Sequence, residues 1–327
     1  MHRFNAAFFC VLVVLAAQTL KAQQADGVWS KAAPMPAPRS ELQAITVGGK
    51  IFVIGGNIRM MKDGEMATLP TTGIGQVYDP ASDTWRDIAP MPRGSTHNGI
   101  ATLNGTIYIA GGFAARGHAE WTDRFYAYDI ATNRWRQLTP LSSPRGAPAL
   151  IALDGKLHIV GGRNGPAAIA THEVYDPATN KWSVAAPLPV ARDHVGIAVV
   201  AGKIHVYGGR TTADTSNVGL HDVYDPATNK WTSAAPMPVP VSSGTFAQYK
   251  GLLIYLGGEC KPDMMHTFSE VQAYDPKTDQ WRLLAAYPVE RHAQAAAVAG
   301  DRLYSFGGAL GCGATNVVAD NLVFQLP

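Results

Sequence analysis

A pair of adjacent glycines recurs at regular intervals at six places along this chain of 327 residues, and this recurrence constrains the fold more than any other feature; a seventh pair, Gly48-Gly49, falls outside the period. Successive pairs are 47 to 56 residues apart, and each ends a short apolar run such as KIFVIGG at 50–56. The pairs begin at Gly55, Gly111, Gly161, Gly208, Gly257 and Gly307. A period of this length predicts a repeat architecture in which each unit is one supersecondary element.

A tyrosine and, seven positions later, a tryptophan follow each of the first five glycine pairs. They are Tyr78 and Trp85, Tyr128 and Trp135, Tyr175 and Trp182, Tyr224 and Trp231, and Tyr274 and Trp281. Between them lie sequences such as DPATNKW at 176–182, where Asp and Pro favour a turn and Asn tolerates a left-handed backbone. Turn dipeptides such as Asn104-Gly105 precede the apolar runs, as expected of β-hairpins. The sequence pattern therefore predicts four short strands in each unit.

The joint recurrence of glycine pair, Tyr and Trp resembles the kelch motif, from about residue 28 to the C-terminus. The resemblance implies an all-β fold, a six-bladed β-propeller with one four-stranded blade per repeat around a central channel. The last unit, which ends at 321–327, supplies only three strands, whereas an additional Trp29 lies in GVWSKAAPMP at 27–36. We expect this N-terminal segment to complete the last blade and close the ring, within one propeller domain over 23–327.

Residues 1–22 have the features of a secretory signal peptide: a weakly basic start, an apolar run over 6–17 and the small residue Ala22 as a cleavage site. The run is shorter than the roughly 18 residues that a spanning helix needs. We therefore expect a periplasmic or secreted protein with no membrane span after cleavage. Cleavage leaves 25 basic and 25 acidic residues. This balance favours neither nucleic acid nor an anionic membrane as a partner.

Cleavage also leaves two cysteines, Cys260 and Cys312, in a compartment that permits disulfides. Each lies shortly after a glycine pair, so the two belong to equivalent loops of adjacent blades. We predict that they form a disulfide, because equivalent loops on one face of adjacent blades can bring two cysteines within bonding distance. Two free thiols are the alternative.

Alternation of strand direction brings two sets of loops to one face, those after the glycine pairs and the Pro-rich connectors between blades. These loops carry the predicted ligand-binding residues, which are Arg39, Arg93, Arg145, Arg163, Arg192, Arg210, Arg291 and His194. Converging guanidinium groups predict an anionic ligand, a carboxylate or an acidic sugar, and an acidic peptide would satisfy the same chemistry. The alternative for each connector arginine is a structural role, in which it hydrogen-bonds carbonyls of the neighbouring blade.

The residue directly after each glycine pair differs from blade to blade, and variation on a fixed scaffold is where function is expected. In the fifth blade this residue opens the stretch GGECKPDMMH at 257–266. Its Gly258, Glu259, Lys261 and Pro262 resemble the Gly-Glu-x-Lys-Pro sequence of the periplasmic sialic acid mutarotases (N-acetylneuraminate epimerases), which are six-bladed kelch enzymes. The resemblance implies that Glu259 is a catalytic acid/base at the anomeric centre of the sugar. Methionines stand where that family has an arginine.

The same stretch resembles the Glu-x3-Asp-x3-His iron site of the plant nitrile-specifier kelch proteins, through Glu259 and Asp263, with His266 one residue early. Two carboxylates and an imidazole suit iron or manganese, so a metal-dependent enzyme is one alternative. On the leading interpretation, an exported sugar-binding isomerase, no cofactor is expected. A further alternative is a non-catalytic module that binds a protein or glycan partner.

Overall fold

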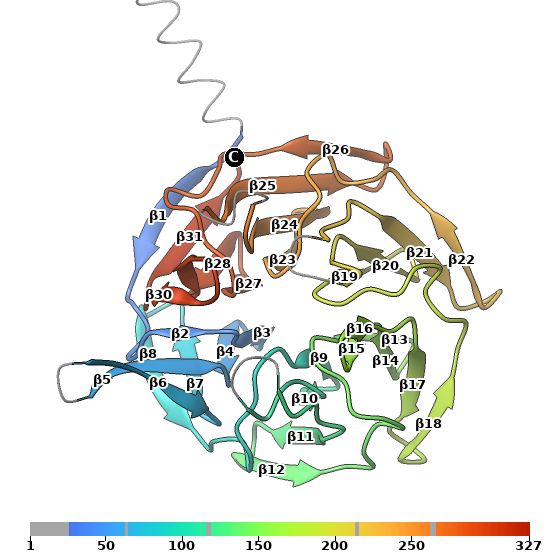
Figure 1. The fold of residues 1–327 in the computed structure, drawn as a ribbon, viewed down its shortest axis with the longest axis horizontal. Helices are drawn as coiled ribbons and strands as arrows, with labels where there is room; N and C mark the ends of the chain where they lie inside the picture. Colours follow the sequence, from blue (N-terminus) through green and yellow to red (C-terminus); the bar gives the residue numbers. More distant parts are fainter. Residues whose placement is uncertain (1–25, 63–64, 116–118, 213–215, 262–265) are drawn as a thin grey trace, which may run out of the picture.

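The computed structural model describes residues 26–327 except 63–64, 116–118, 213–215 and 262–265, and leaves out the side chains of 59–70. Over this part of the chain there are six four-stranded antiparallel sheets, arranged as the blades of a propeller around a central axis (Figure 1). The same residues contain no helix with the length and apolarity needed to cross a membrane. The predicted signal peptide, 1–22, lies outside the described residues.

Each blade has its first strand at the axis and its fourth at the rim (Figure 1). The innermost strands are β3 (Gln43–Val47), β9 (Gly99–Leu103), β13 (Ala149–Leu153), β19 (Gly196–Val200), β23 (Thr245–Tyr249) and β27 (Ala295–Ala299). The second strands are β4 (Lys50–Ile54), β10 (Thr106–Ala110), β14 (Lys156–Val160), β20 (Lys203–Tyr207), β24 (Leu252–Gly258) and β28 (Arg302–Phe306). The third strands are β7 (Gly75–Asp79), β11 (Phe125–Asp129), β17 (His172–Asp176), β21 (His221–Asp225), β25 (Phe268–Asp275) and β31 (Asn321–Gln325).

The outer strands are β8 (Thr84–Ile88), β12 (Arg134–Gln137), β18 (Lys181–Val184), β22 (Lys230–Ser233), β26 (Gln280–Leu283) and β1 (Val28–Ala32). Three small sheets form between the loops. They are β2 (Arg39–Ser40) with β5 (Asn57–Lys62) and β6 (Glu65–Thr71), β15 (Arg163–Asn164) with β16 (Ala167–Ala168), and β29 (Ala309–Gly311) with β30 (Thr315–Val317). We call the end of the propeller with these loops and the connectors the loop end, and the opposite end, with the tight turns, the turn end.

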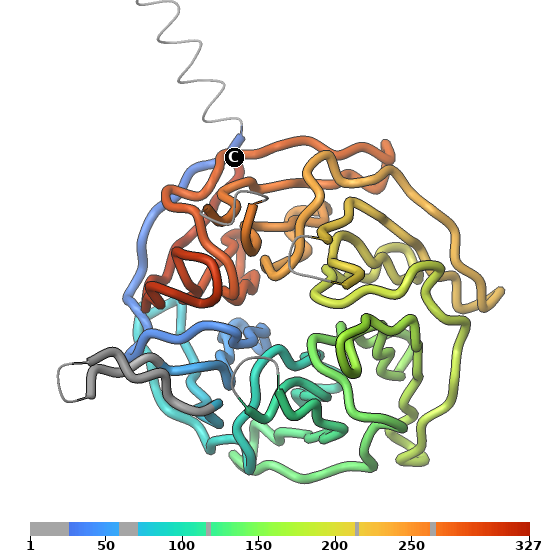
Figure 2. Tube along the Cα trace, viewed as in Figure 1, coloured from blue at the N-terminus to red at the C-terminus, as the bar shows by residue number. Residues whose placement is uncertain are grey.

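The N-terminal segment closes the ring, as predicted. Strand β1 pairs antiparallel with β31, with Trp29 opposite Phe324. In Figure 2 the N-terminal segment runs along the outer edge of the last blade. The Trp29 ring also stacks on Tyr287, with centroids 4.6 Å apart, and its indole nitrogen donates to the carbonyl of Ala285 at 3.0 Å. The last blade therefore has no open edge at β31.

The repeated Tyr and Trp join each blade to the one before it. In the first blade the hydroxyl of Tyr78 donates to Asp83, and Trp85, opposite Tyr78 in the sheet, donates its indole N–H to the carbonyl of Ala33. Asp83 also accepts from the amide of Ala33, at 2.7 Å. The next four blades repeat the set with Asn133, Asn180, Asn229 and Asp279 at the position of Asp83. This position has φ of 53–55°, which explains the preference for Asn or Asp there.

The core is divided into clusters that each lie between two neighbouring blades. One example joins Phe52 and Ile54 of the first blade to Ile107 and Ile109 of the second. The glycine pairs allow the same close approach at the loop end. The amide of Gly258 donates to the carbonyl of Arg291 in the next blade at 3.0 Å, and a Cβ on Gly257 would lie 2.4 Å from that carbonyl oxygen. A side chain at Gly257 would push the two blades apart.

Candidate functional site at the loop end of the channel

A short backbone bridge recurs in each blade at the loop end. The residue after the glycine pair faces a connector residue, as where Asp193 and Arg210 exchange two N–H···O bonds of 3.1 Å. Equivalent contacts join Ser40 with Asn57, Thr96 with Phe113, Gly146 with Arg163, Ser242 with Glu259, and His292 with Ala309. Each blade therefore presents two side chains whose identity the repeat does not fix.

The next connector residue of each blade forms a ring of backbone hydrogen bonds around the axis. These residues have φ of 49–58° and are Glu41, His97, Ala147, His194, Ser243 and Ala293. Five of the six steps around the ring are N–H···O bonds of 2.7–3.3 Å between neighbouring members. At the remaining step the Tyr255 hydroxyl donates to the carbonyl of His194 at 3.4 Å and accepts from the amide of Gly244 at 3.1 Å.

Four of the predicted connector arginines occupy one equivalent position and are buried within their blades. Arg39 donates to Gln76, Arg145 to Glu173, Arg192 to Asp222 at 2.7 Å, and Arg291 to Asp320 at 3.1 Å. All four are at most 1% exposed. These four side chains therefore have the structural role that was the alternative to ligand binding, except that each contacts its own blade rather than the neighbouring blade. They do not reach a ligand surface.

Burial lowers the pKa of three of these guanidinium groups, those of Arg39, Arg145 and Arg192. Burial lowers the pKa of Arg39 to about 10, against a raising effect of Asp87. Burial likewise lowers the pKa of Arg192, partly offset by Asp222. Glu173 and Asp222 balance the buried charges of Arg145 and Arg192.

Arg93 does not belong to this set. The position equivalent to Arg39 in the second blade is Ser95, which is buried, whereas Arg93 lies two residues earlier and is exposed. The sequence MPRGS has an arginine in a Pro-rich connector, and for this reason alone Arg93 was predicted to be equivalent to the other connector arginines. Alignment by the bridge and ring residues separates it.

The predicted residues Arg163, His194, Arg210 and Glu259 gather with Asp193 and His292 in a group that we call the loop-end cluster. Asp193 is at its centre: one carboxylate oxygen lies 3.0 Å from Nε of Arg210 and the other 2.6 Å from Nε of Arg163. The side chain of Arg210 is fully buried, whereas that of Arg163 keeps 11% of its surface exposed. Arg163 is therefore the guanidinium of the cluster that solvent reaches.

His194 is held in a defined tautomer within this cluster. Its Nδ1 lies 2.7 Å from Asp193, and its Nε2 faces Nη2 of Arg210 at 3.4 Å. Burial, and then the charge of Arg210, keeps the pKa of His194 well below its usual range. Burial alone would raise the pKa of Asp193, but His194, Arg210 and Arg163 outweigh it and hold that pKa below the ordinary value. Asp193 is thus ionised and His194 neutral, with Nδ1 protonated.

Glu259 lies beside Arg210 on the side of the last blade. Its Oε2 is 3.2 Å from Nη1 of Arg210, and its Oε1 is 3.9 Å from Nδ1 of His292. The Glu259 side chain is 9% exposed and that of His292 is fully buried. With two arginines and two carboxylates, the cluster is balanced in charge rather than basic.

The ring side chains extend this polar network across the axis. His97 Nε2 lies 2.6 Å from the carboxylate of Glu41, and its ring is 5.0 Å from that of His194 in an edge-to-face contact. Below these residues the channel is a cavity of about 390 Å³, lined largely by apolar side chains of the innermost strands, such as Ile45 and Ile197. Polar groups are thus concentrated where the channel meets the loops.

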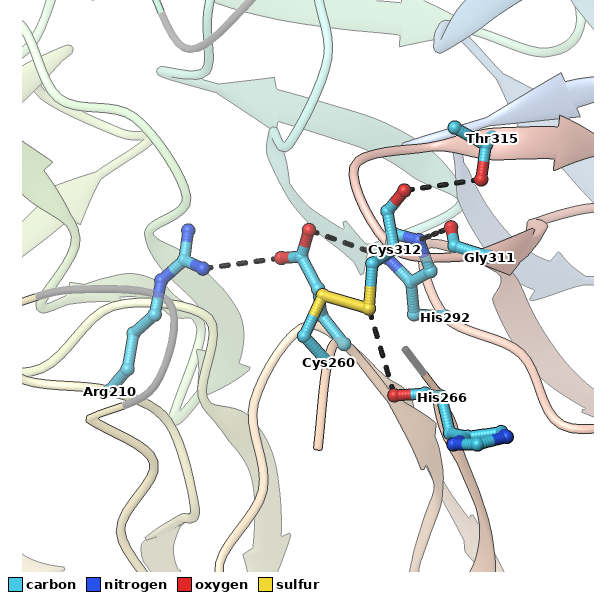
Figure 3. The surroundings of a disulfide bond; sticks show 8 residues. Arg210, Cys260, His266, His292, Gly311, Cys312 and Thr315 are labelled. Carbon is cyan, nitrogen blue, oxygen red and sulfur yellow. Dashed lines mark hydrogen bonds and ion pairs between the residues drawn. A yellow bond between two sulfur atoms is a disulfide. The ribbon is translucent and has the colours of Figure 1, made fainter. Parts of the chain in front are cut away.

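The predicted disulfide is present and flanks Glu259. Cys260 and Cys312 are bonded, with Cα atoms 5.3 Å apart, and join the loop of the fifth blade to the β29–β30 hairpin of the sixth (Figure 3). In Figure 3 Arg210 and His292 lie on opposite sides of the carboxylate next to Cys260. The crosslink therefore connects the loop that carries Glu259 to the loop that contacts His292.

The described residues do not assemble the suggested metal ligands. Asp263 lies outside them, and His266 is exposed, with its ring directed away from Arg210 and His292 in Figure 3. Across the described parts of the chain, no group of three His, Cys, Asp or Glu side chains is placed to hold a metal ion. Glu259 is instead paired with Arg210.

Sequence reasoning identified Arg163, His194, Arg210 and Glu259, and the structure brings all four together. It missed Asp193, which joins Arg163 to Arg210. The sequence did contain a signal for Asp193. When the six connectors are aligned on the arginine position, the residue that follows varies as much as the residue after the glycine pair. These residues are Ser40, Thr96, Gly146, Asp193, Ser242 and His292. These two variable positions face each other.

Two family models match more than half of the chain each. The Attractin/LZTR1 beta-propeller matches residues 100–318, and the KLHDC2/KLHL20/DRC7 Kelch-repeats domain matches residues 5–188. The solved structure titled "Structure of YjhT" is similar over 90% of this chain and 100% of its own, with a TM-score of 0.73 and 15% identity. At that identity the likeness concerns the fold alone.

Curated relatives are similar over shorter stretches. Kelch-like protein terF of Aspergillus terreus is 37% identical over 90 residues, covering 27% of this chain and 19% of the relative. Kelch-like protein 15 of Danio rerio is 33% identical over 91 residues, covering 28% of this chain and 15% of the relative. The matched region thus spans less than a fifth of either relative's length.

Proposed function

Because the chain belongs to the kelch-repeat β-propellers, we propose that its loop end is a binding site for an anionic, hydroxyl-rich small molecule, an acidic sugar, with Glu259 as an acid/base. The observation that carries the proposal is the environment of Glu259. Its carboxylate is nearly buried at a variable loop position and is held by Arg210 rather than by a residue of the repeated scaffold. Charged groups that the scaffold does not require, in a desolvated site, are typical of function.

The guanidinium group of Arg163 supports the anionic part of the proposal. It lies in the same cluster, keeps some solvent access, and is 2.6 Å from Asp193, which holds it in place. A ligand carboxylate can approach Arg163 from the solvent side and accept its remaining N–H groups. Because the cluster is balanced in charge, the hydroxyl groups of the ligand must supply the rest of the recognition.

The reaction implied by the resemblance to the mutarotases is compatible with this set of groups. Opening of a cyclic hemiketal requires a base that takes the proton of the anomeric hydroxyl while the ring C–O bond breaks, and an acid that gives a proton to the ring oxygen. Closure on the other face of the carbonyl reverses both transfers, so no atom or electron is gained or lost. Glu259 as carboxylate would perform the first transfer.

The test combines calorimetric titration with sialic and uronic acids and an NMR measurement of anomer exchange in sialic acid. We expect binding and acceleration by the wild type, weaker binding by Arg163→Ala, and loss of acceleration in Glu259→Gln. Asp154→Asn, an exposed position in the β13–β14 turn at the turn end of the propeller, is the control and should behave as wild type. Absence of both heat and acceleration in the wild type would refute the proposal.

A non-catalytic binding module is the second candidate, and the internal pairing of the cluster favours it. The charges of Asp193, Arg210 and Glu259 already neutralise one another, as in a structural network. In that case a protein or glycan would contact the surrounding loops. Equal ligand binding by wild type and Glu259→Gln, without anomer exchange in either, would select this candidate.

Export is also part of the proposal. The features of residues 1–22 support it, and the Cys260–Cys312 disulfide is consistent with an oxidising compartment. N-terminal sequencing of the mature protein after secretion would test it, with Gln23 expected as the first residue.

A further inference from the structure

The first residue of the innermost strand is different in one blade from all the others. In the first blade it is Gln43, whereas the other five blades have a small residue there: Gly99, Ala149, Gly196, Thr245 and Ala295. Gln43 lines the channel cavity and is only partly buried. Its side-chain amide makes no hydrogen bond to another residue of the described chain. The repeat therefore does not require an amide at this position, and the amide is accessible from the channel.

Glu41 lies two residues before Gln43, in the ring of residues with positive φ, and also lines the cavity. Its side chain is 10% exposed, and its Oε2 lies 2.6 Å from Nε2 of His97, which fixes the direction of the carboxylate. A carboxylate has about four acceptor positions, so this contact alone does not exhaust it. Two other blades have alanine at this ring position, so the scaffold does not require the carboxylate either. We call Glu41 and Gln43 the channel pair.

The wall of the channel adds backbone polar groups to this pair. Over the described residues each innermost strand is hydrogen-bonded to another strand on one side only, so alternate N–H and C=O groups face the axis. A hydrocarbon chain would leave these groups without partners, whereas a hydroxylated chain offers both donors and acceptors. The cavity of about 390 Å³ has room for on the order of ten groups of the size of a water molecule. The channel is therefore suited to a short hydroxylated chain.

The channel pair lies next to the loop-end cluster. His194 belongs to the cluster through its contact with Asp193, and its ring lies edge-to-face against that of His97, with centroids 5.0 Å apart. The other oxygen of Asp193 is 2.6 Å from Nε of Arg163. A ligand whose carboxylate is held at Arg163 can therefore extend across the two imidazole rings to the channel pair.

We infer that the channel pair binds a polyhydroxylated chain that projects from the ring of the acidic sugar; the inference rests on the proposed function. One hydroxyl group of the chain donates to Glu41, and a second both donates to and accepts from the amide of Gln43. A site that pairs with a hydroxyl group discriminates against analogues that lack it, because its own polar groups then lose their partners. The pair thereby selects acidic sugars with an exocyclic chain.

The test is a thermodynamic cycle between the chain and Gln43. The two probes are sialic acid and an analogue whose exocyclic chain has been shortened by periodate cleavage and reduction. In calorimetric titration the wild type should bind the shortened analogue about 10-fold more weakly than sialic acid, as expected for two lost hydrogen bonds. Gln43→Ala should bind sialic acid about 3-fold more weakly than the wild type does, and the analogue equally well.

Glu41→Ala should show the same selective loss as Gln43→Ala. Alanine occupies the equivalent position of both residues in other blades, so we expect the melting temperature of each variant to be retained. Gln248→Ala is the matched control, because it makes the same replacement at an exposed position of the same cavity near the turn end. It should bind both probes as the wild type does.

The outcomes distinguish the inference from the proposed function. If the wild type binds both probes equally, or if Gln43→Ala weakens both probes equally or neither, the inference is wrong and the proposed function stands. An equal selective loss in Gln248→Ala would also overturn it, because the effect would not be specific to the channel pair. If the wild type binds neither probe, the proposed function fails and the inference fails with it.

Discussion

At the turn end of the propeller the same side-chain contacts recur in blade after blade, whereas at the loop end the same backbone bridge carries different side chains. The Tyr hydroxyl, the Asn or Asp beside it and the Trp indole form equivalent hydrogen bonds in five blades. The bridge, in contrast, holds Gly146 with Arg163 in one blade and Asp193 with Arg210 in the next. A contact that is repeated stabilises the ring, and a residue that changes on a constant backbone is available for function.

The largest effect is expected from breaking the repeated contacts where the ring closes. Removal of residues 23–36 deletes β1, the stacking of Trp29 on Tyr287 and the Trp29 hydrogen bond to Ala285. It also exposes the edge of β31 to solvent and to other chains. We expect the melting temperature to fall by more than about 10 °C, with aggregation, as measured by differential scanning calorimetry.

The milder substitutions Trp29→Phe and Trp85→Phe sharpen this comparison. Both remove one indole hydrogen bond to a neighbouring connector, of 3.0 Å in each case, and should cost similar amounts, about 1–2 kcal/mol. An unchanged melting temperature for the truncated protein would show that the ring does not depend on β1.

The repeated part of the molecule was predictable because each of its contacts leaves a periodic trace in the sequence. The glycine pairs, Tyr, Asn and Trp specify strand ends, turns and blade contacts independently in each unit. The ring closure followed from one displaced residue, Trp29. The disulfide followed from the equivalence of two loops.

The candidate site was predictable only in part, because its geometry depends on contacts between blades that no period records. Arg163, Arg210 and Glu259 were found as variable residues, but Asp193 connects them and was overlooked. The arginines of the connectors were assigned to a ligand because residue type alone does not reveal burial. Arg39 and Arg192 have carboxylate or amide partners on a third strand, far away in sequence.

The second largest effect concerns a variation inside the scaffold, two buried histidine pairs in the third and fourth blades. Nδ1 of His158 lies 2.9 Å from Nε2 of His172, whose Nδ1 donates to the carbonyl of Ala186. The carbonyl of Ala186 also accepts the indole of Trp231. His205 and His221 repeat the arrangement at 2.9 Å, so both pairs are part of the contacts between blades.

These histidines predict a loss of stability in acid. Burial, chiefly, lowers the pKa of each of the four to about 4 from an ordinary value of 6.5. Between these pH values the unfolded chain binds more protons than the folded one, so the free energy of unfolding falls as pH falls from 6.5 towards 4. We expect a loss on the order of 5 kcal/mol in all, measured by urea denaturation across this range. Replacing one pair, as in His205→Gln/His221→Gln, should make the pH dependence shallower, and an equally steep profile would contradict this origin.

A third effect, smaller than the acid destabilisation, separates the connector arginines that belong to the scaffold from the one that does not. Arg192→Met removes the partner of Asp222 and leaves a buried carboxylate uncompensated, which should cost about 3–5 kcal/mol in the free energy of unfolding. Arg93→Met alters an exposed side chain in an equivalent connector and should change stability by less than about 0.5 kcal/mol. Adding Asp222→Leu to Arg192→Met should recover much of the loss, because the unpaired charge is then removed. Urea denaturation of the three variants measures this. Equal losses for Arg192→Met and Arg93→Met would mean that position along the connector does not decide which arginine supports the fold, and that the division between repeated and variable contacts fails at the loop end.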